Sequence, residues 1–211
     1  MEQENQETYI DSLYDADTVL AEVKESIRQA GMPEISIATG YGRLLTLLVA
    51  ASGAERVLEI GALGGYSGIC LARGLSEGGK LICLERVPAY AQLASENVKH
   101  AGFGGKVEYM VGDAVESLQQ LDERGEKFDF FFIDADKGNY LVYLDYALKL
   151  GKPGAIIVAD NVFLGGRTLN PSAQGESPKA IREYNRRIAA DPALQSTIIP
   201  AYDGLSIARI L

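Results

Sequence analysis

The chain contains very little of several residue types on which enzyme sites often depend. Its 211 residues include one histidine, two cysteines and no tryptophan. With His100 alone, an imidazole-rich zinc or non-haem iron site is hard to build. Cys70 and Cys83 lie in apolar segments without the spacing of metal ligands, so we expect a reduced, cytoplasmic protein.

Basic residues and long apolar runs are also scarce. Lysine and arginine number 20 against 29 acidic residues, which gives a formal net charge of −9. This excess of negative charge disfavours non-specific binding to a phosphate backbone, so a nucleic-acid partner would need a local basic patch. No apolar run approaches the roughly 18 residues of a membrane span, and the first residues are polar and acidic rather than signal-like. We therefore expect neither nucleic acid nor membrane as a partner.

The pattern along the chain predicts one α/β domain over residues 1–211, with a helical segment at 1–52 and an α/β core at 53–211. Near-continuous apolar runs predict strands buried on both faces of a parallel sheet, at 57–60, 81–84, 107–111, 128–133 and 155–159. Helical periodicity occupies the intervals 66–75, 88–100, 114–121 and 140–150. The first 52 residues predict two helices divided near Met32-Pro33. A last helix from about residue 177 and an antiparallel pair at 196–200 and 205–211 complete the prediction.

Two polar clusters follow predicted strands. Asp134, Asp136 and Lys137 come after the strand at 128–133, and Asp160-Asn161 come after the strand at 155–159. The carboxyl ends of parallel strands meet at one edge of a sheet, where open α/β folds bind ligands. Two acids and an amide there suit a hard divalent cation.

A glycine-rich loop follows the first predicted strand, from Glu59 to Ser67. Its glycines allow the backbone to approach a ligand and turn directly into a helix. Glu85, 26 residues after Glu59, ends the next strand and could bind a ribose diol. The loop lacks the G-x-G opening of the dinucleotide fingerprint. An adenosine-containing cofactor is therefore indicated, and a dehydrogenase stays an alternative.

Four motifs in order resemble the cation-dependent O-methyltransferases, the group that includes caffeoyl-CoA and catechol O-methyltransferases and many small bacterial relatives. The motifs are residues 57–67, 132–137, 159–162 and 202–205, and the match runs from about Met32 to the end. The resemblance implies the class I S-adenosylmethionine-dependent methyltransferase fold, which is Rossmann-like. That fold has a seven-stranded, mostly parallel sheet with an antiparallel last strand and helices on both faces. The resemblance also implies a homodimer.

The resemblance further implies three sets of site residues. Binding of S-adenosylmethionine is expected at Ile37, Glu59, Gly61, Ala62, Ser67, Glu85, Asp113, Ala114 and Asp134. A divalent cation, most simply Mg²⁺ with Ca²⁺ or Mn²⁺ as alternatives, is expected at Asp134, Asp160 and Asn161. Asp134 and Lys137 are the expected catalytic residues, with Lys137 as general base. Helix packing explains Ile37 as well, and an N-cap explains Asp113.

The expected activity is methyl transfer to a hydroxyl of a small catechol-type vicinal diol. Methylation of a hydroxylated uridine in tRNA is a second hypothesis. An adenine-dinucleotide oxidoreductase or a non-catalytic nucleotide-binding module is a third. Acceptor-facing segments are expected in the loop at 162–175, around Tyr202-Asp203, and in the N-terminal helices. Tyr9, Tyr14 and Tyr41 could supply aromatic walls there, although helix packing explains them equally well.

Overall fold

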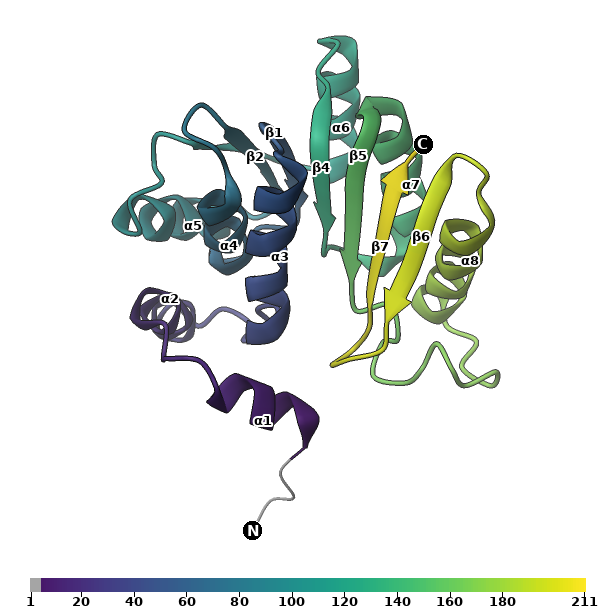
Figure 1. The fold of residues 1–211 in the computed structure, drawn as a ribbon, viewed down its shortest axis with the longest axis horizontal. Coiled ribbons are helices and arrows are strands. Elements are labelled where there is room, and N and C mark those ends of the chain that lie inside the picture. Colours follow the sequence, from purple (N-terminus) through teal and green to yellow (C-terminus); the bar gives the residue numbers. More distant parts are fainter. Residues whose placement is uncertain (1–4) are drawn as a thin grey trace.

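A computed structural model describes residues 5–211, which form a seven-stranded sheet with helices on both faces (Figure 1). The strands are β1 (Arg56–Ile60), β2 (Lys80–Glu85), β3 (Val107–Val111), β4 (Phe128–Ile133), β5 (Gly151–Asp160), β6 (Leu194–Ile199) and β7 (Leu205–Ile210). The helices are α1 (Gln6–Ser12), α2 (Thr18–Gln29), α3 (Thr39–Ser52), α4 (Tyr66–Gly74), α5 (Pro88–His100), α6 (Ala114–Glu123), α7 (Tyr140–Leu150) and α8 (Glu176–Ala190). A short 3₁₀ turn, η1 (Lys137–Asn139), leads directly into α7.

The strand order confirms the predicted fold class. The order is β3-β2-β1-β4-β5-β7-β6, with parallel pairing from β3 to β5. The last strand, β7, is antiparallel to both of its neighbours. The chain moves outward to β2 and β3 on one side of β1 and to β4 and β5 on the other. The crevice at the carboxyl ends of β1 and β4 is therefore the switch point where ligands bind in such sheets.

Alternating side chains along each strand fill two separate cores. On β4, Phe130 and Phe132 face the layer of α2, α3, α4 and α5, whereas Phe131 and Ile133 face the layer of α6, α7 and α8. All four side chains are completely buried. Burial on both faces is the reason that β4 reads as a continuous apolar run in the sequence.

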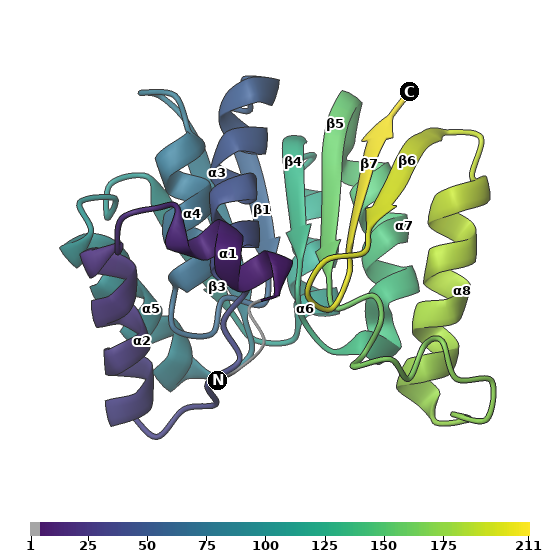
Figure 2. The same ribbon diagram turned by 60° about the horizontal axis from the view of Figure 1, so that its bottom comes forward.

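The N-terminal segment contains three helices, so the prediction of two was wrong. The extra break lies between α1 and α2, where Asp17 caps α2 by accepting a hydrogen bond from the Leu20 N–H at 3.0 Å. Asp17 also pairs with Arg73 of α4. The break thus depends on a partner distant in the sequence. Figure 2 shows α1 crossing the face of α3.

The structure also bears on the cysteines and on the apolar segments considered in the sequence. Both cysteines are free and buried. Within residues 5–211, no helix has both the length and the apolar character needed to span a bilayer.

Candidate active site

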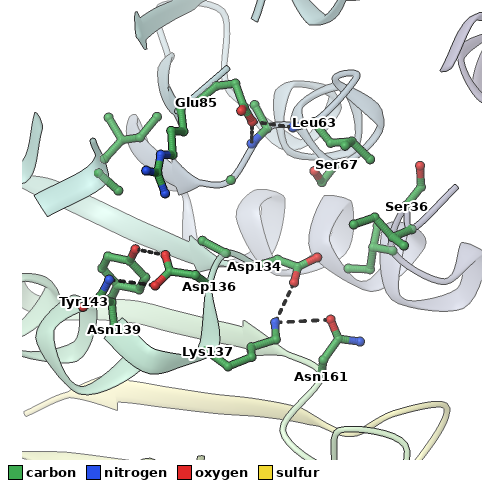
Figure 3. A pocket seen from close by; sticks show the side chains of 18 of the residues that line it. Ser36, Leu63, Ser67, Glu85, Asp134, Asp136, Lys137, Asn139, Tyr143 and Asn161 are labelled. Carbon is green, nitrogen blue, oxygen red and sulfur yellow. Dashed lines mark hydrogen bonds and ion pairs between the residues drawn. The ribbon is translucent and has the colours of Figure 1, made fainter. Parts of the chain in front are cut away.

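A cavity of about 1070 Å³ opens at the switch point between β1 and β4. Its walls come from the loops after β1, β2, β3, β4 and β5, together with the segments before α3 and β7. Most of the residues predicted to form the site line it: Ile37, Gly61, Ala62, Ser67, Glu85, Asp113, Ala114, Asp134, Lys137 and Asn161. Figure 3 shows that these residues form two groups, one around Glu85 and one around Lys137.

The glycine loop forms one wall by bringing its backbone close to the end of β4. Gly61 has a φ of +97°, and a Cβ there would overlap the carbonyl oxygen of Asp134. Gly65, with a φ of +87°, is the N-cap residue of α4. Glycine is required at both positions because larger residues rarely adopt this conformation. The N-terminal turn of α4 then faces the cavity through Ser67.

Glu85 organises this loop rather than projecting into solvent. Its Oε2 accepts hydrogen bonds from the N–H groups of Ala62 and Leu63 at 3.2 and 2.9 Å. Its Oε1 accepts from the Val87 N–H at 2.9 Å. The carboxylate is 8% exposed and still lines the cavity. One side chain therefore connects the loop after β1 to the loop after β2.

Glu59 lies below the cavity and does not line it. The residue is fully buried on β1, beside Cys83 of β2 in the sheet register. Neither carboxylate oxygen has a hydrogen-bond partner among the described residues. Burial raises the pKa of Glu59 to about 7, because a low-dielectric environment disfavours the charged form.

Asp113 and Ile37 each combine a structural role with a position at the cavity, so neither of the two explanations given for each residue excludes the other. Asp113 caps α6 by accepting from the Val115 N–H at 2.9 Å, and it also lines the cavity. Ile37 is almost entirely buried in the core beneath α2 and α3, and it too lines the cavity.

The second group of site residues surrounds the amine of Lys137. Lys137 Nζ lies 2.9 Å from Asp134 Oδ1 and 3.3 Å from Asn161 Oδ1. It also donates to the Tyr140 hydroxyl at 2.5 Å. The side chains come from η1 and from the ends of β4 and β5, so the structure places together the two polar clusters that the sequence separates (Figure 3).

Asp160 lies buried beneath these side chains and does not line the cavity. It is 3% exposed, and its Oδ1 accepts the Asn161 N–H at 2.7 Å. Burial and the nearby charge of Asp134 raise the pKa of Asp160 to about 7. Asn161 has a φ of +57°, a left-handed conformation that asparagine tolerates better than most residues. This turn directs the Asn161 amide toward Lys137.

The donor set fits a hard divalent cation. Its members are oxygen ligands, as Mg²⁺ prefers, and the oxygens of Asp134 and Asn161 already surround a positively charged side chain. Residues 5–211 contain no group of three or more His, Cys, Asp or Glu suited to a metal. The proposed set therefore depends on the amide of Asn161 as its third ligand.

Asp136 does not pair with Lys137. Its Oδ1 accepts from the Tyr143 hydroxyl at 2.5 Å, and its Oδ2 accepts from the Asn139 side-chain amide at 2.7 Å. Asp136 thus stabilises the loop between β4 and α7.

The aromatic residues of the cavity are not the ones named from the sequence. Tyr9, Tyr14 and Tyr41 do not line it, and that expectation was wrong. Tyr41 is buried and its hydroxyl donates to the Ala201 carbonyl, whereas Tyr9 and Tyr14 are more than half exposed. The cavity tyrosines are instead Tyr66, Tyr90 and Tyr143.

Further lining residues lie in two segments expected to face the acceptor, and of these residues only Asp203 was named from the sequence. Leu164, Gly165 and Arg167 lie in the loop expected to face the acceptor, and Asp203 lies in the turn before β7. The glycine-rich composition of the first segment and the Asp-Gly pair of the second located the loops. Only the folded backbone shows which of their residues face inward.

The N-terminal segment contacts the chain's own core beside this turn. Arg43 of α3 pairs with Asp11 at 2.5 Å, and its guanidinium lies 4.0 Å from the centre of the Tyr14 ring. Glu7 of α1 accepts a hydrogen bond from the Tyr202 N–H at 2.5 Å. These contacts connect α1 to the segment that carries Asp203.

Comparisons with known proteins agree with this geometry. A family model described as O-methyltransferase matches residues 10–211. A catechol O-methyltransferase from Niastella koreensis is 39% identical, over 98% of this chain and 97% of the relative. A second, from Mycobacterium tuberculosis, is 38% identical over 97% and 94% of the two chains. The structure of an O-methyltransferase from Bacillus cereus in complex with SAH superimposes with a TM-score of 0.91 at 39% identity, covering 97% of this chain and 96% of the other. The oxidoreductase and nucleotide-binding alternatives are thereby replaced: the chain belongs to the O-methyltransferase family.

Proposed function

We propose that the chain transfers the methyl group of S-adenosylmethionine to one hydroxyl of a small catechol-type diol, with the help of a divalent cation, most simply Mg²⁺. The observation that carries the proposal is the placement of Lys137 among the oxygens of Asp134 and Asn161, on the wall opposite the glycine loop. The names of the relatives support the class of acceptor, and the SAH complex of the Bacillus cereus protein supports the donor.

The wall formed by the glycine loop and Glu85 is the proposed site of the donor. Here the N-terminal turn of α4 offers free N–H groups, which suit the carboxylate of the methionine moiety. Glu85 uses three hydrogen bonds to hold the loop, and its remaining lone pairs can accept from ribose hydroxyls. Asp113 and Ala114, at the end of β3, are proposed to contact the adenine.

The opposite wall is the proposed site of the acceptor. A divalent cation, when bound there, would polarise the acceptor oxygens and favour the phenolate. Asp134, Asp160 and Asn161 would supply three oxygen ligands, leaving about half of an octahedral shell for other oxygens. Two adjacent hydroxyls can fill neighbouring positions of such a shell, whereas a single hydroxyl cannot.

Lys137, in its neutral amine form, is the proposed acceptor of the proton that the reacting hydroxyl releases. A phenol with a pKa of about 10 is mostly neutral at pH 7, so a nearby amine assists its ionisation. Lys137 Nζ lies on the acceptor wall and contacts Asp134 at 2.9 Å. Holding donor and acceptor together in the cavity supplies the proximity and orientation that methyl transfer requires.

An acceptor screen tests this proposal. Purified protein is incubated with S-adenosylmethionine and Mg²⁺, either with a panel of catechols or with bulk tRNA, and methylated products are measured by mass spectrometry. We expect methylated catechols and no methylated tRNA. Transfer to tRNA without transfer to any diol would favour the alternative in which a hydroxylated uridine is the acceptor.

A homodimer in the cytoplasm is the proposed state of the protein. Apolar side chains of the N-terminal segment remain exposed after α1 packs on α3, namely Tyr9, Ile10, Leu13 and Tyr14. Such a group of exposed apolar residues is suited to cover a partner. Light scattering at micromolar concentration tests the dimer, and a mass near the 22.7 kDa of one chain would contradict it.

A further inference from the structure

We propose that Tyr140 is a positioning residue, whose hydroxyl holds the amine of Lys137 against the candidate metal ligands. This inference rests on the proposed function, because it assigns Tyr140 a role in the same reaction. Tyr140 acts through Lys137 and touches neither donor nor acceptor, since it is completely buried and does not line the cavity.

The location of Tyr140 makes its hydroxyl a rigid reference point. It is the first residue of α7, and its ring packs edge-on against Tyr184 of α8 at a centroid distance of 5.4 Å. Its backbone N–H donates to the Lys137 carbonyl and closes the η1 turn. Both the main chain and the side chain of Tyr140 therefore constrain the residue three positions before it.

The direction of the hydrogen bonds can be assigned from their partners. The Tyr140 hydroxyl lies 2.9 Å from the carbonyl oxygen of Asp160, which can only accept. A second carbonyl oxygen, that of Ile133, lies 3.3 Å from the hydroxyl. The single phenolic proton is therefore directed toward a carbonyl, of which that of Asp160 is the nearer, and the oxygen lone pairs are left to face Lys137 Nζ at 2.5 Å. An amine donates in this arrangement whether or not it carries the additional proton.

Tyr140 thereby connects two parts of the site that meet only in the folded chain. Asp160 and Asn161 end β5, whereas Lys137 follows β4. Among the acceptors of Lys137, the Tyr140 oxygen is the nearest, and it is not a candidate metal ligand. The oxygens of Asp134 and Asn161 would turn toward a cation when one binds, so Tyr140 is the acceptor that would continue to fix the amine.

The variant Tyr140→Phe tests the role because it keeps the ring and removes only the oxygen. Loss of a hydrogen bond to a charged group should lower kcat about 10-fold to 100-fold, with the affinity for S-adenosylmethionine unchanged. Tyr184→Phe is the matched control: it removes an equally buried hydroxyl, bonded to Ser206 at 2.9 Å, and should leave kcat within about twofold of wild type.

A double-mutant cycle separates positioning from a general loss of structure. If Tyr140 acts through Lys137, Tyr140→Phe should have no further effect in a Lys137→Ala background. Equal losses of kcat in both backgrounds, or a wild-type kcat in Tyr140→Phe, would overturn the proposal. A crystal structure of Tyr140→Phe should show Lys137 Nζ displaced from Asp134, and an unmoved amine would also contradict it.

Two further controls keep the result unambiguous. If Tyr140→Phe does not fold, replacing Tyr140 with 4-aminophenylalanine retains a donor to Asp160 but puts a second donor in front of Lys137. This substitution should lower kcat by a similar factor, and wild-type turnover would refute the role. A wild-type protein that methylates no acceptor would instead refute the proposed function, while the crystal structure would still report on the position of Lys137.

Discussion

The two walls of the cavity are built in different ways. The donor wall is formed mainly by backbone, with Gly61 and Gly65 in glycine-specific conformations and Glu85 accepting three main-chain hydrogen bonds. The acceptor wall is formed by side chains, and Lys137 and Asn161 come from separate loops. The donor wall thus holds its shape without a ligand, because the carboxylate of Glu85 is already paired with main-chain N–H groups of the two loops.

The acceptor wall holds two neighbouring carboxylates, of which Asp134 pairs with Lys137 and Asp160 accepts a hydrogen bond from the Asn161 N–H. Asp160 is buried close to Asp134, and burial together with that neighbouring charge raises the pKa of Asp160 to about 7. A cation bound among these oxygens would remove the repulsion. The donor wall therefore depends on local backbone conformation, whereas the acceptor wall is proposed to depend on a charge balance that a bound ion would complete.

The largest effect should come from removing the amine of the acceptor wall. Lys137→Ala should lower turnover by about 10²–10⁴-fold, the range for a lost general base, while the affinity for S-adenosylmethionine changes little. The defect should shrink as the pH approaches the pKa of the acceptor, because the phenolate then forms without assistance. Steady-state kinetics from pH 7 to pH 10 check this, with the exposed Lys179→Ala as control. An undiminished variant at neutral pH would exclude Lys137 as base.

The stability of the folded protein should depend on pH through Glu59, the buried residue at the start of the glycine loop. The folded pKa of Glu59, about 7, exceeds the ordinary value of 4.5. The folded state therefore binds more protons between these values, and stability falls as pH rises through that window, by on the order of 3 kcal/mol. Glu59→Gln should flatten this dependence and be more stable than wild type at pH 8.

Urea denaturation of the ligand-free protein at pH 5 to pH 8 measures this dependence. The exposed Glu108→Gln, on β3, should retain the wild-type slope. Parallel curves for Glu59→Gln and wild type would show that Glu59 is ionised in the folded protein throughout the range.

The next effect concerns the carboxylate that holds the glycine loop. Glu85→Ala removes the acceptor of three main-chain N–H groups and the proposed ribose contact. The affinity for S-adenosylmethionine should fall about 10-fold to 100-fold, as expected for the loss of hydrogen bonds to a charged group. Glu85→Gln, which keeps one oxygen, should lose less. Calorimetric titration of both variants provides the measurement, and unchanged affinity in a folded Glu85→Ala would remove Glu85 from the donor site.

The smallest effect should come from the N-terminal segment. Arg43→Ala removes the ion pair with Asp11 and the contact with the Tyr14 ring, both on the surface. Since an exposed pair contributes at most about 1 kcal/mol, the acceptor KM should rise no more than about fivefold, with the donor KM unchanged. A change in the donor KM instead would show that α1 supports the other wall.

The sequence predicted the sheet well because its strands and helices follow local patterns. The bounds of β3, β4, α5 and α7 are those predicted, and the glycine loop and Glu85 line the cavity. The break at Asp17 was missed because its partner, Arg73, lies on α4. Tyr140 was not predicted to have the role proposed here, because the sequence around it has the pattern of a buried helix residue. Its hydroxyl finds Lys137 and Asp160 only after β4 and β5 have paired.

A cation bound by Asp134, Asp160 and Asn161 is proposed to complete the acceptor wall and to select vicinal diols as acceptors. The most direct measurement compares methylation of catechol and of phenol by the wild-type enzyme, in Mg²⁺ and in excess chelator. We predict that catechol reacts rapidly in Mg²⁺, that chelation lowers this rate by at least about 100-fold, and that added Mg²⁺ restores it. Phenol should react slowly under every condition. Equal rates on the two acceptors, unchanged by the chelator, would contradict both the role of a cation and the selection of vicinal diols.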